Sequence, residues 1–323
     1  MFKTFGRSSL LALGLVISAS APGFAQLSKL EFIVPGGPGS GLDQAARAFE
    51  EALKAEKLVT STQVTHVAGG GGMTAISQFA TSKVGNANAV LTNGAGSLVF
   101  PLANKSPVSL RTVAPLARIA GEYEIMVVRS DSEFKTIDDL IAKYKANPPA
   151  ILWAAGARGS TDHIFYAMVS KAVGVDPKKL NFIPNTNTGE IVAAVLGGHV
   201  AVGAGGYQDF APQVEAGKMR VLVVASAERL KGIDAPTLKE KGIDVVVTNW
   251  RGVSAHPSVS EPDLDKLSEA FDKMVKSATW KKMLADRGWN DMDLNRKDYA
   301  AFQRAEEARL TPILQDLGML AQQ

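Results

Sequence analysis

Four short segments of this 323-residue chain could bind an anion through backbone groups. Each is rich in glycine and small polar residues, follows an apolar run and precedes a helical pattern; they are residues 35–43, 68–74, 155–162 and 185–189. Glycine lets the backbone approach a ligand closely, and the first turn of a helix offers unpaired N–H donors with a partial positive charge of about +0.5. Any one segment can be explained as a tight turn, whereas four in similar positions predict a shared carboxylate site.

Three side chains near these segments are candidates for contact with a ligand. Asp43 would either select a ligand amine or hydroxyl or cap the helix that follows. Arg158 lies in an otherwise uncharged loop and could form a bidentate pair with a carboxylate, unless it is solvated or neutralised by Asp162. Tyr207 follows a glycine pair after a strand and either reaches the ligand or packs with its hydroxyl in water.

The sequence lacks the motifs of nucleotide binding, covalent catalysis and metal binding. It contains no G-x-x-x-x-G-K-[ST], no G-x-G-x-x-G and no G-x-S-x-G, and it has no cysteine. Ser254 and His256 lie too close along one expected strand to form a working pair. The four histidines, His66, His163, His199 and His256, lack the spacing of a zinc site. We therefore expect no catalytic residue, no metal ion and no cofactor.

Short β-branched runs alternate with amphipathic helical patterns, which favours parallel α/β sheets. Strands are expected at residues 30–34, 63–67, 89–92, 124–128, 151–155, 181–183, 200–203 and 221–225. Helices are expected at residues 44–57, 74–82, 137–146, 161–173, 190–197, 264–276 and 297–317, and the chain after Trp250 is mostly helical in pattern. In a parallel sheet, the four glycine-rich segments would lie at the carboxyl ends of strands, where open α/β sheets bind ligands.

Residues 1–25 read as a secretory signal that is cleaved near Ala25. Lys3 and Arg7 supply a positive start, residues 9–19 are mostly apolar, and residues 23–25 resemble a signal-peptidase site. The alternative, a membrane anchor, needs about 20 apolar residues. The full chain carries a net charge of +3, and loss of the two basic residues would leave it close to neutral. This charge does not favour nucleic acid as a partner. We expect a soluble, exported monomer with two lobes.

Segments along nearly the whole mature chain resemble one protein family. They are residues 38–43 (PGSGLD), 69–72 (GGGG), 156–160 (GARGS), 196–200 (LGGHV), 218–222 (KMRVL), 226–230 (SAERL), 236–242 (PTLKEKG) and 250–252 (WRG). Their order and spacing are similar to those of the extracytoplasmic solute receptors of the tripartite tricarboxylate transporters, also called Bug proteins. The resemblance implies an α/β, type II periplasmic-binding-protein fold with a hinge and a central cleft. Residues 26–123 plus 250–323 would form lobe 1, and residues 124–249 would form lobe 2.

The resemblance also implies which loops hold the ligand. The residues carried over by position are Gly39, Ser40, Gly41, Gly70, Gly71, Gly72, Thr92 and Asn93 from lobe 1, and Gly156, Ala157, Ser160, Thr186, Asn187 and Thr188 from lobe 2. Many members carry Pro-Tyr-x-Gly-Gly where this chain has PNTNT at residues 184–188, so contacts from lobe 2 should differ. The Gly-Ser-Gly-x-Asp form of the first loop is similar to the branch that takes citrate-like tricarboxylates.

Two functions of different class follow. The resemblance implies a periplasmic receptor that captures a small di- or tricarboxylate and delivers it to integral-membrane permease subunits; a variant of this role couples the loaded receptor to a sensor kinase. The competing hypothesis is a periplasmic enzyme acting on a carboxylate or phosphate ester in the same cleft. It requires a base and a nucleophile that the sequence does not reveal.

Overall fold

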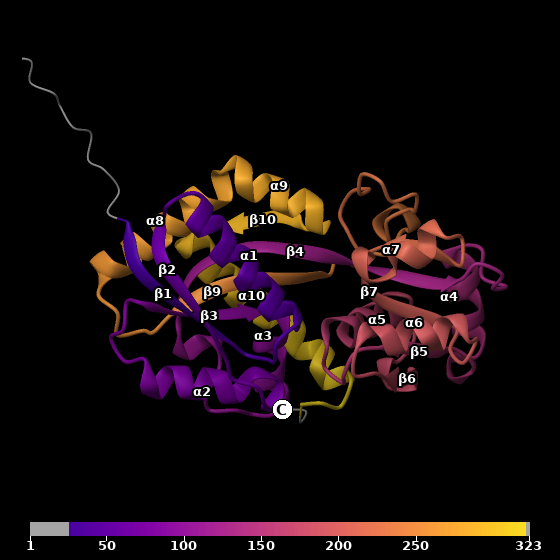
Figure 1. The fold of residues 1–323 in the computed structure, drawn as a ribbon. Helices are drawn as coiled ribbons and strands as arrows, with labels where there is room; N and C mark the ends of the chain where they lie inside the picture. The colour runs from indigo at the N-terminus through magenta and orange to yellow at the C-terminus, as the bar shows by residue number, and fades with distance from the viewer. Residues whose placement is uncertain (1–25, 321–323) are drawn as a thin grey trace, which may run out of the picture.

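The computed structural model describes residues 26–320, which form two lobes, and the long strand β4 runs from one lobe into the other (Figure 1). The elements are β1 (Leu27–Val34), α1 (Gly41–Ala55), β2 (Val59–His66), the 3₁₀ turn η1 (Gly70–Gly72), α2 (Met73–Ser82), β3 (Ala89–Gly94), α3 (Ala95–Ala103), β4 (Ala114–Arg129), α4 (Ile137–Ala146), β5 (Leu152–Ala155), α5 (Thr161–Ala172), β6 (Asn181–Pro184), α6 (Thr188–Leu196), β7 (Val202–Gly206), α7 (Tyr207–Glu215), β8 (Met219–Val224), β9 (Thr248–Ala255), α8 (Glu261–Lys276), α9 (Ala278–Arg287), β10 (Asn290–Leu294) and α10 (Arg296–Asp316).

Lobe 1 is defined here by a sheet with the strand order β2-β1-β3-β9-β4, with β10 also paired to β4. β1 runs parallel to β2 and β3, and β9 runs antiparallel to β3 and β4. Helix α1 buries one face against this sheet, because Ala45, Ala48, Phe49 and Ala52 recur at helical spacing and are fully covered. Phe49 also packs on Trp280 of α9, with ring centroids 5.6 Å apart.

Lobe 2 contains the second half of β4 followed by β7, β5 and β6, with β8 also paired to β4. β5 runs parallel to β6 and β7. Its core is aromatic: Trp153 lies 5.0 Å from Tyr144 and 4.8 Å from Tyr166 between ring centroids. The buried Tyr166 hydroxyl donates to the carbonyl of Ala154 at 2.9 Å, so the core contains no unpaired phenol at this point.

The chain crosses between the lobes on neighbouring strands. On β4, Tyr123 pairs with Thr248 of β9 in lobe 1, whereas the next residue, Glu124, pairs with Gly206 of β7 in lobe 2. Val247, just before β9, donates to Ala225 of lobe 2. The predicted lobe boundary at residues 123/124 and the predicted hinge at residues 121–124 and 246–251 stay predictions, and the changes of strand pairing fall in the same places.

All the expected strands and helices occur, with boundaries that shift by a few residues except at β4, which begins ten residues before the expected strand. The expected parallel pairing occurs between β1 and its neighbours β2 and β3, and between β5 and its neighbours β6 and β7, whereas β4 and β9 run antiparallel to their neighbours. The mostly helical pattern expected after Trp250 missed β9 and β10, and the sequence also concealed α3, α7 and α9. α3 and α7 are short and each contains an internal proline, which weakens a helical pattern. Among the described residues, no helix is both long enough and apolar enough to cross a bilayer.

Candidate ligand-binding cleft

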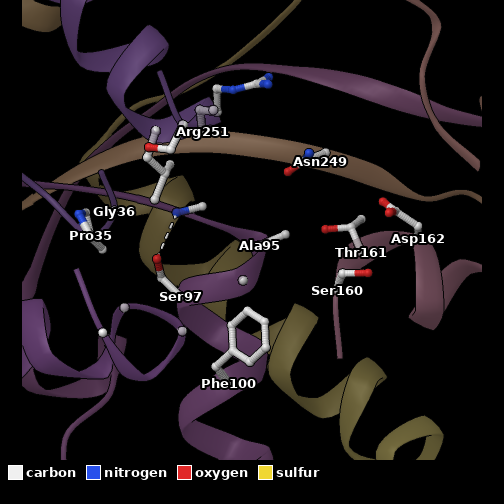
Figure 2. A pocket seen from close by; sticks show the side chains of 18 residues that line it. Pro35, Gly36, Ala95, Ser97, Phe100, Ser160, Thr161, Asp162, Asn249 and Arg251 are labelled. Carbon is white, nitrogen blue, oxygen red and sulfur yellow. Dashed lines mark hydrogen bonds between the residues drawn. The ribbon is translucent and has the colours of Figure 1, made fainter. Parts of the chain in front are cut away.

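A cleft lies between the lobes, at the end of the sheets where β1, β2, β5 and β6 stop. Two adjoining cavities of about 400 and 970 Å³ form it, and both are lined by Gly41, Ser160, Asp162 and Asn249. Figure 2 shows the smaller cavity, with Ser160 and Asp162 of lobe 2 facing the lobe 1 residues across it. Because each lobe supplies part of the lining, a bound ligand would contact both.

The start of α1 forms the lobe 1 wall of the cleft. Ser40 is the N-cap, and its hydroxyl accepts the N–H of Asp43 at 3.3 Å. Gly39 takes a left-handed φ of 81° and donates its N–H to the Asp43 carboxylate at 2.8 Å. The N–H groups of Gly41 and Leu42 have no partner among the described residues, so the helix start offers two donors to the cleft.

Asp43 stabilises this loop and does not line either cavity. Its carboxylate is buried and lies 2.8 Å from His66 Nε2 and 3.1 Å from Arg47 Nε. Burial raises the pKa of Asp43, but the hydrogen bonds from Gly39, His66 and Arg47 outweigh burial and hold the pKa below its usual value. Ser40, and not Asp43, is the N-cap of α1; Asp43 lies in the first turn, and its carboxylate is used within lobe 1.

Two further helix starts complete the lobe 1 wall. Gly71 and Gly72 lead into α2 with φ values of 64° and 97°, and a Cβ atom on Gly71 would lie 2.5 Å from Phe100. Glycine is therefore required there by both backbone angle and space. The start of α3 also lines the cleft: Gly94 donates its N–H to Ser97 Oγ at 3.3 Å. The sequence gave no indication of this third helix start.

The start of α5 forms the facing wall in lobe 2. Gly159 has a φ of 84°, and Ser160 is the N-cap whose hydroxyl accepts the N–H of His163 at 3.3 Å. The Gly159 N–H donates to His163 Nδ1 at 3.1 Å, and the imidazole packs on Phe182 with centroids 4.1 Å apart. Burial, together with the nearby Arg158 charge, lowers the pKa of His163 to about 4, so the ring is neutral near pH 7.

The loop at residues 184–188 lines the larger cavity. Asn187 caps α6, accepting the N–H of Glu190 at 3.1 Å, and Thr186 donates both its N–H and its hydroxyl to the Glu190 carboxylate at 2.8 and 2.7 Å. The predicted ligand contacts of Thr186 and Asn187 therefore compete with bonds inside the loop. Thr188 is the first residue of α6 and lies on the cavity wall.

Arg251 supplies a positive charge beside the start of α1. The side chain is 7% exposed, lines the smaller cavity and stacks over Trp289 at 4.6 Å. Its Nη2 lies 3.2 Å from Glu122 Oε2 and would lie 3.8 Å from a Cβ atom on Gly41. Its Nη1 is buried without a partner among the described residues. The Nη2 atom is thus the part of the guanidinium nearest to the α1 start.

Three acids lie on the lobe 2 side of the cleft. Asp162 and Asp209 line the larger cavity, and Glu124 lies behind them, 1% exposed, with its carboxyl group hydrogen-bonded to that of Asp162. Burial, followed by the neighbouring Asp162 charge, raises the pKa of Glu124 well above its usual value. Although Asp209 opens to the cleft, surrounding protein and the charges of Glu122 and Asp162 raise its pKa to about 6.

The structure brings together most of the site residues expected from the sequence. Those that line the cleft are Ser40, Gly41, Gly71, Gly72, Gly156, Ala157, Arg158, Ser160, Thr186, Asn187 and Thr188. Arg158 is exposed and faces the Phe182 ring at 5.8 Å, and the described contacts include no ion pair with Asp162. Gly70 lines a neighbouring hollow with Phe100.

The other expected residues lie outside the cleft. Thr92 and Asn93 are fully buried below it, where Asn93 donates to Ser254 Oγ at 2.9 Å and accepts from the Tyr299 hydroxyl. Gly39 shapes the loop without lining a cavity. Tyr207 lines a separate hollow with Trp289. Within residues 26–320, no group of three or more acidic or histidine side chains is arranged to hold a metal ion.

Two lobes joined at a hinge-like crossing, with helix starts from both facing one cleft, define a two-lobed solute-binding protein. The comparisons with known proteins agree. The family model for the tripartite tricarboxylate transporter family receptor, TctC, matches residues 45–319. The chain therefore belongs to this receptor family, and the family expected from the sequence is confirmed.

Relatives and solved structures support this assignment. A protein from the gbd 5′ region of Cupriavidus necator is 30% identical over 63% of this chain and 62% of its own length, and BugT of Bordetella pertussis is 26% identical over 73% and 72%. The first of these matches thus spans less than two thirds of the relative. A ligand-free TctC solute-binding protein from Polaromonas has a TM-score of 0.76 at 24% identity, covering 90% of this chain and 99% of that one. A malate-bound MatC from Rhodopseudomonas palustris has a TM-score of 0.72 at 19% identity, covering 89% and 99%. These likenesses confirm the two-lobed periplasmic-binding-protein fold.

Proposed function

We propose that the mature chain is a periplasmic receptor that captures a small carboxylate between its lobes and delivers it to membrane permease subunits. The observation that carries the proposal is the pairing of two helix starts across one cleft, at Ser40–Gly41 in lobe 1 and Ser160–Thr161 in lobe 2. Each start presents backbone N–H groups toward the same space, and such groups bind anions without a basic side chain. Arg251 adds a fixed positive charge on the lobe 1 side.

Di- and tricarboxylates are the first ligand class to test. The family is named for tricarboxylates, and two structural neighbours from R. palustris contain malate and adipate. The adipate-bound neighbour has a TM-score of 0.75 at 20% identity and covers 90% of this chain and 97% of that one. Citrate itself is supported only by the resemblance of the first loop, Gly39–Asp43.

Export and partners form part of the same proposal. Residues 1–25 would direct the chain to the periplasm and be cleaved near Ala25, leaving a monomer that docks on integral-membrane permease subunits. Coupling to a sensor kinase is an additional role compatible with a closed, ligand-bound form. Closure would follow from contacts that the ligand makes with both lobes only when they approach each other. No covalent chemistry is required.

Thermal unfolding of the mature protein against a ligand panel tests this function. The panel contains citrate, malate, succinate, glutarate, adipate, aromatic carboxylates, amino acids and inorganic phosphate. A ligand present at about 100 times its Kd should add about 2.7 kcal/mol to the free energy of unfolding. Stabilisation by a carboxylate that is recovered unchanged is the expected result. Absence of stabilisation by every carboxylate would contradict the proposal, and conversion of the ligand would favour the enzyme hypothesis.

A further inference from the structure

The last helix, α10, also connects the two lobes. Midway along it, Glu307 pairs at 2.7 Å with Arg111, which precedes β4 in lobe 1. At its end, Asp316 pairs at 2.6 Å with Lys171 of α5 in lobe 2. Figure 1 shows the end of α10 beside lobe 2. Buried side chains of both helices form one apolar cluster, which includes Leu310, Ile313 and Leu314 of α10 and Ile164 and Ala167 of α5.

The turn after α10 directs the chain back against the same cluster. Gly318 has a left-handed φ of 70° and donates its N–H to the carbonyl of Gln315 at 2.9 Å, and the Met319 N–H donates to the carbonyl of Leu314 at 2.8 Å. This pair of bonds is the Schellman arrangement, which fixes the direction of the chain past a helix end. As a result, Met319 packs on the cluster. Residues 309–320 are called the strap below.

The strap contacts the loop that forms the lobe 2 wall of the cleft. A Cβ atom on Gly159 would lie 2.9 Å from Met319 Cε and 3.6 Å from Phe100 Cε1 of α3. Gly159 directly precedes Ser160, the N-cap of α5, which lines both cavities. Because Gly159 has no side chain, the strap and α3 reach the backbone of this loop. The start of α5 therefore packs against lobe 1 and the strap together.

A proline lies inside the strap, between its contacts with the two lobes. Pro312 follows Glu307, which binds lobe 1, and precedes Asp316, which binds lobe 2. Proline has no N–H, so the helix lacks one backbone hydrogen bond at this point and can bend there. On the preceding turn, Arg309 donates at 3.2 Å to the carbonyl of Val246, where the chain crosses between the lobes. The strap is therefore anchored at the crossing and able to bend beyond it.

We propose that the strap holds the start of α5 against lobe 1, so that the closed arrangement of the lobes is populated before a ligand binds. Opening the lobes would separate buried apolar side chains of α10 from those of α5, which is unfavourable in proportion to the area exposed. Met319 lines neither cavity of the cleft, so the effect needs no contact with the ligand. A receptor that is closed only part of the time has an affinity reduced by its closed fraction. This consequence for affinity rests on the proposed receptor function, whereas the closed fraction of the free protein does not.

Distances between spin labels in the ligand-free protein test the proposal. The chain contains no cysteine, so Ser82→Cys in α2 and Lys145→Cys in α4, both at exposed positions, would carry one label in each lobe. Pulsed electron paramagnetic resonance then gives the ratio of short to long separations, and hence of closed to open molecules. Met319→Ala should lower this ratio at least about fivefold, because the strap loses its contact with Gly159. Met319→Leu, which keeps an apolar side chain of similar volume, should stay within about twofold of the parent ratio.

Met283→Ala is the matched control, since Met283 is buried in the core of lobe 1 and lies outside the strap. It should lower the free energy of unfolding and leave the ratio unchanged. Asp316→Lys, at a partly exposed position, reverses one charge of the pair with Lys171 and should lower the ratio about twofold. An unchanged ratio in Met319→Ala would overturn the proposal, as would an unchanged ratio in Asp316→Lys if the first variant fails to fold. A parent protein that shows only the long separation would overturn it too. The ligand panel for the receptor function can fail without altering any of these outcomes.

Discussion

The starts of α1 and α5 share one backbone design in two lobes of different sequence. Each begins with a glycine in the left-handed region, at 81° for Gly39 and 84° for Gly159, followed by a serine N-cap. In both, the serine hydroxyl accepts the N–H of the residue three positions on, at 3.3 Å, and that residue's side chain accepts the glycine N–H. The repeated geometry aims two helix starts at one cleft.

The two loops differ in the side chain that accepts the glycine N–H. Lobe 1 uses the ionised Asp43, balanced by Arg47 and His66, whereas lobe 2 uses a neutral imidazole packed on an aromatic ring. The position after the serine differs as well, being Gly41 in lobe 1 and Thr161 in lobe 2. The same arrangement of backbone N–H groups is therefore stabilised by charged side chains in lobe 1 and by a packed neutral ring in lobe 2. The two loops should differ in ligand binding and in the pH dependence of their stability.

Gly41→Leu should weaken ligand binding more than any other change, because it places a side chain in the cleft at the start of α1. The new Cβ would meet only Arg251 Nη2, at 3.8 Å, so the fold should tolerate it. The rest of the side chain would occupy the position of the ligand carboxylate. We expect the Kd of the ligand that stabilises the parent protein to rise at least about 1,000-fold, or about 4 kcal/mol. Titration calorimetry measures this change.

Gly37→Leu is the control in the same loop, since a Cβ there has no atom within 4 Å and Gly37 lines neither cavity. It should bind like the parent. Gly71 is unsuitable for this test, because its φ of 64° and the contact with Phe100 would disturb the fold itself. Unchanged affinity in Gly41→Leu, with an unchanged unfolding midpoint, would show that the ligand does not use the α1 start.

The second prediction distinguishes Asp43 and His163, the two side chains that accept a glycine N–H, by the pH dependence of the free energy of unfolding. The folded pKa of His163, about 4, lies below its usual value of 6.5, so between these values the unfolded chain binds a proton that the folded protein excludes. Stability from this group is complete above about pH 6.5 and is lost as the pH falls toward 4, by about 3 kcal/mol. In His163→Asn, which keeps an acceptor for Gly159, the free energy of unfolding should change correspondingly less over this range.

Chemical denaturation at several pH values measures the free energy of unfolding of His163→Asn and of the parent protein. Raised pKa values of Glu124 and Asp209 act in the opposite sense, but they are common to both proteins and cancel in the comparison. His199→Asn, at an exposed position, should follow the parent. Asp43→Asn should alter the profile chiefly below about pH 4, since its lowered pKa stabilises the fold above that point. Parallel profiles for His163→Asn and the parent would mean that the buried ring accepts a proton.

Much of this site was predictable because its signals are local. Glycine next to serine ahead of a helical pattern marks a helix start in one stretch of sequence, so Ser40, Gly41 and Ser160 were found. Asp43 was weighed as a cap or a ligand residue, but the N-cap is Ser40, and Asp43 contacts Arg47 and His66 within lobe 1. The family resemblance supplied the order of the loops and hence the two-lobed fold.

What the sequence could not show depends on long-range pairing. Glu124 faces Asp162 and Asp209 only because β4 changes partner from β9 to β7 at that residue. Arg251 reaches the α1 start through the central position of β9. Tyr207 was taken as a cleft residue, yet Asp209, two positions on and about 200° around α7, is the one that lines it. Pattern alone does not say which face of a short helix meets the ligand.

The smallest effect should come from the two serine caps, and it tests their equivalence directly. Ser40 and Ser160 have nearly identical backbone angles, with φ of −65° and −64° and ψ of 160° and 164°, and each accepts one N–H at 3.3 Å. Ser40→Ala and Ser160→Ala should each lower the free energy of unfolding by about 1 kcal/mol, because each removes one N-cap acceptor. The double variant should lose the sum, since sites in separate lobes are independent. If one variant loses over about 1 kcal/mol more of its free energy of unfolding than the other, the two serine caps have the same geometry but contribute unequally to stability.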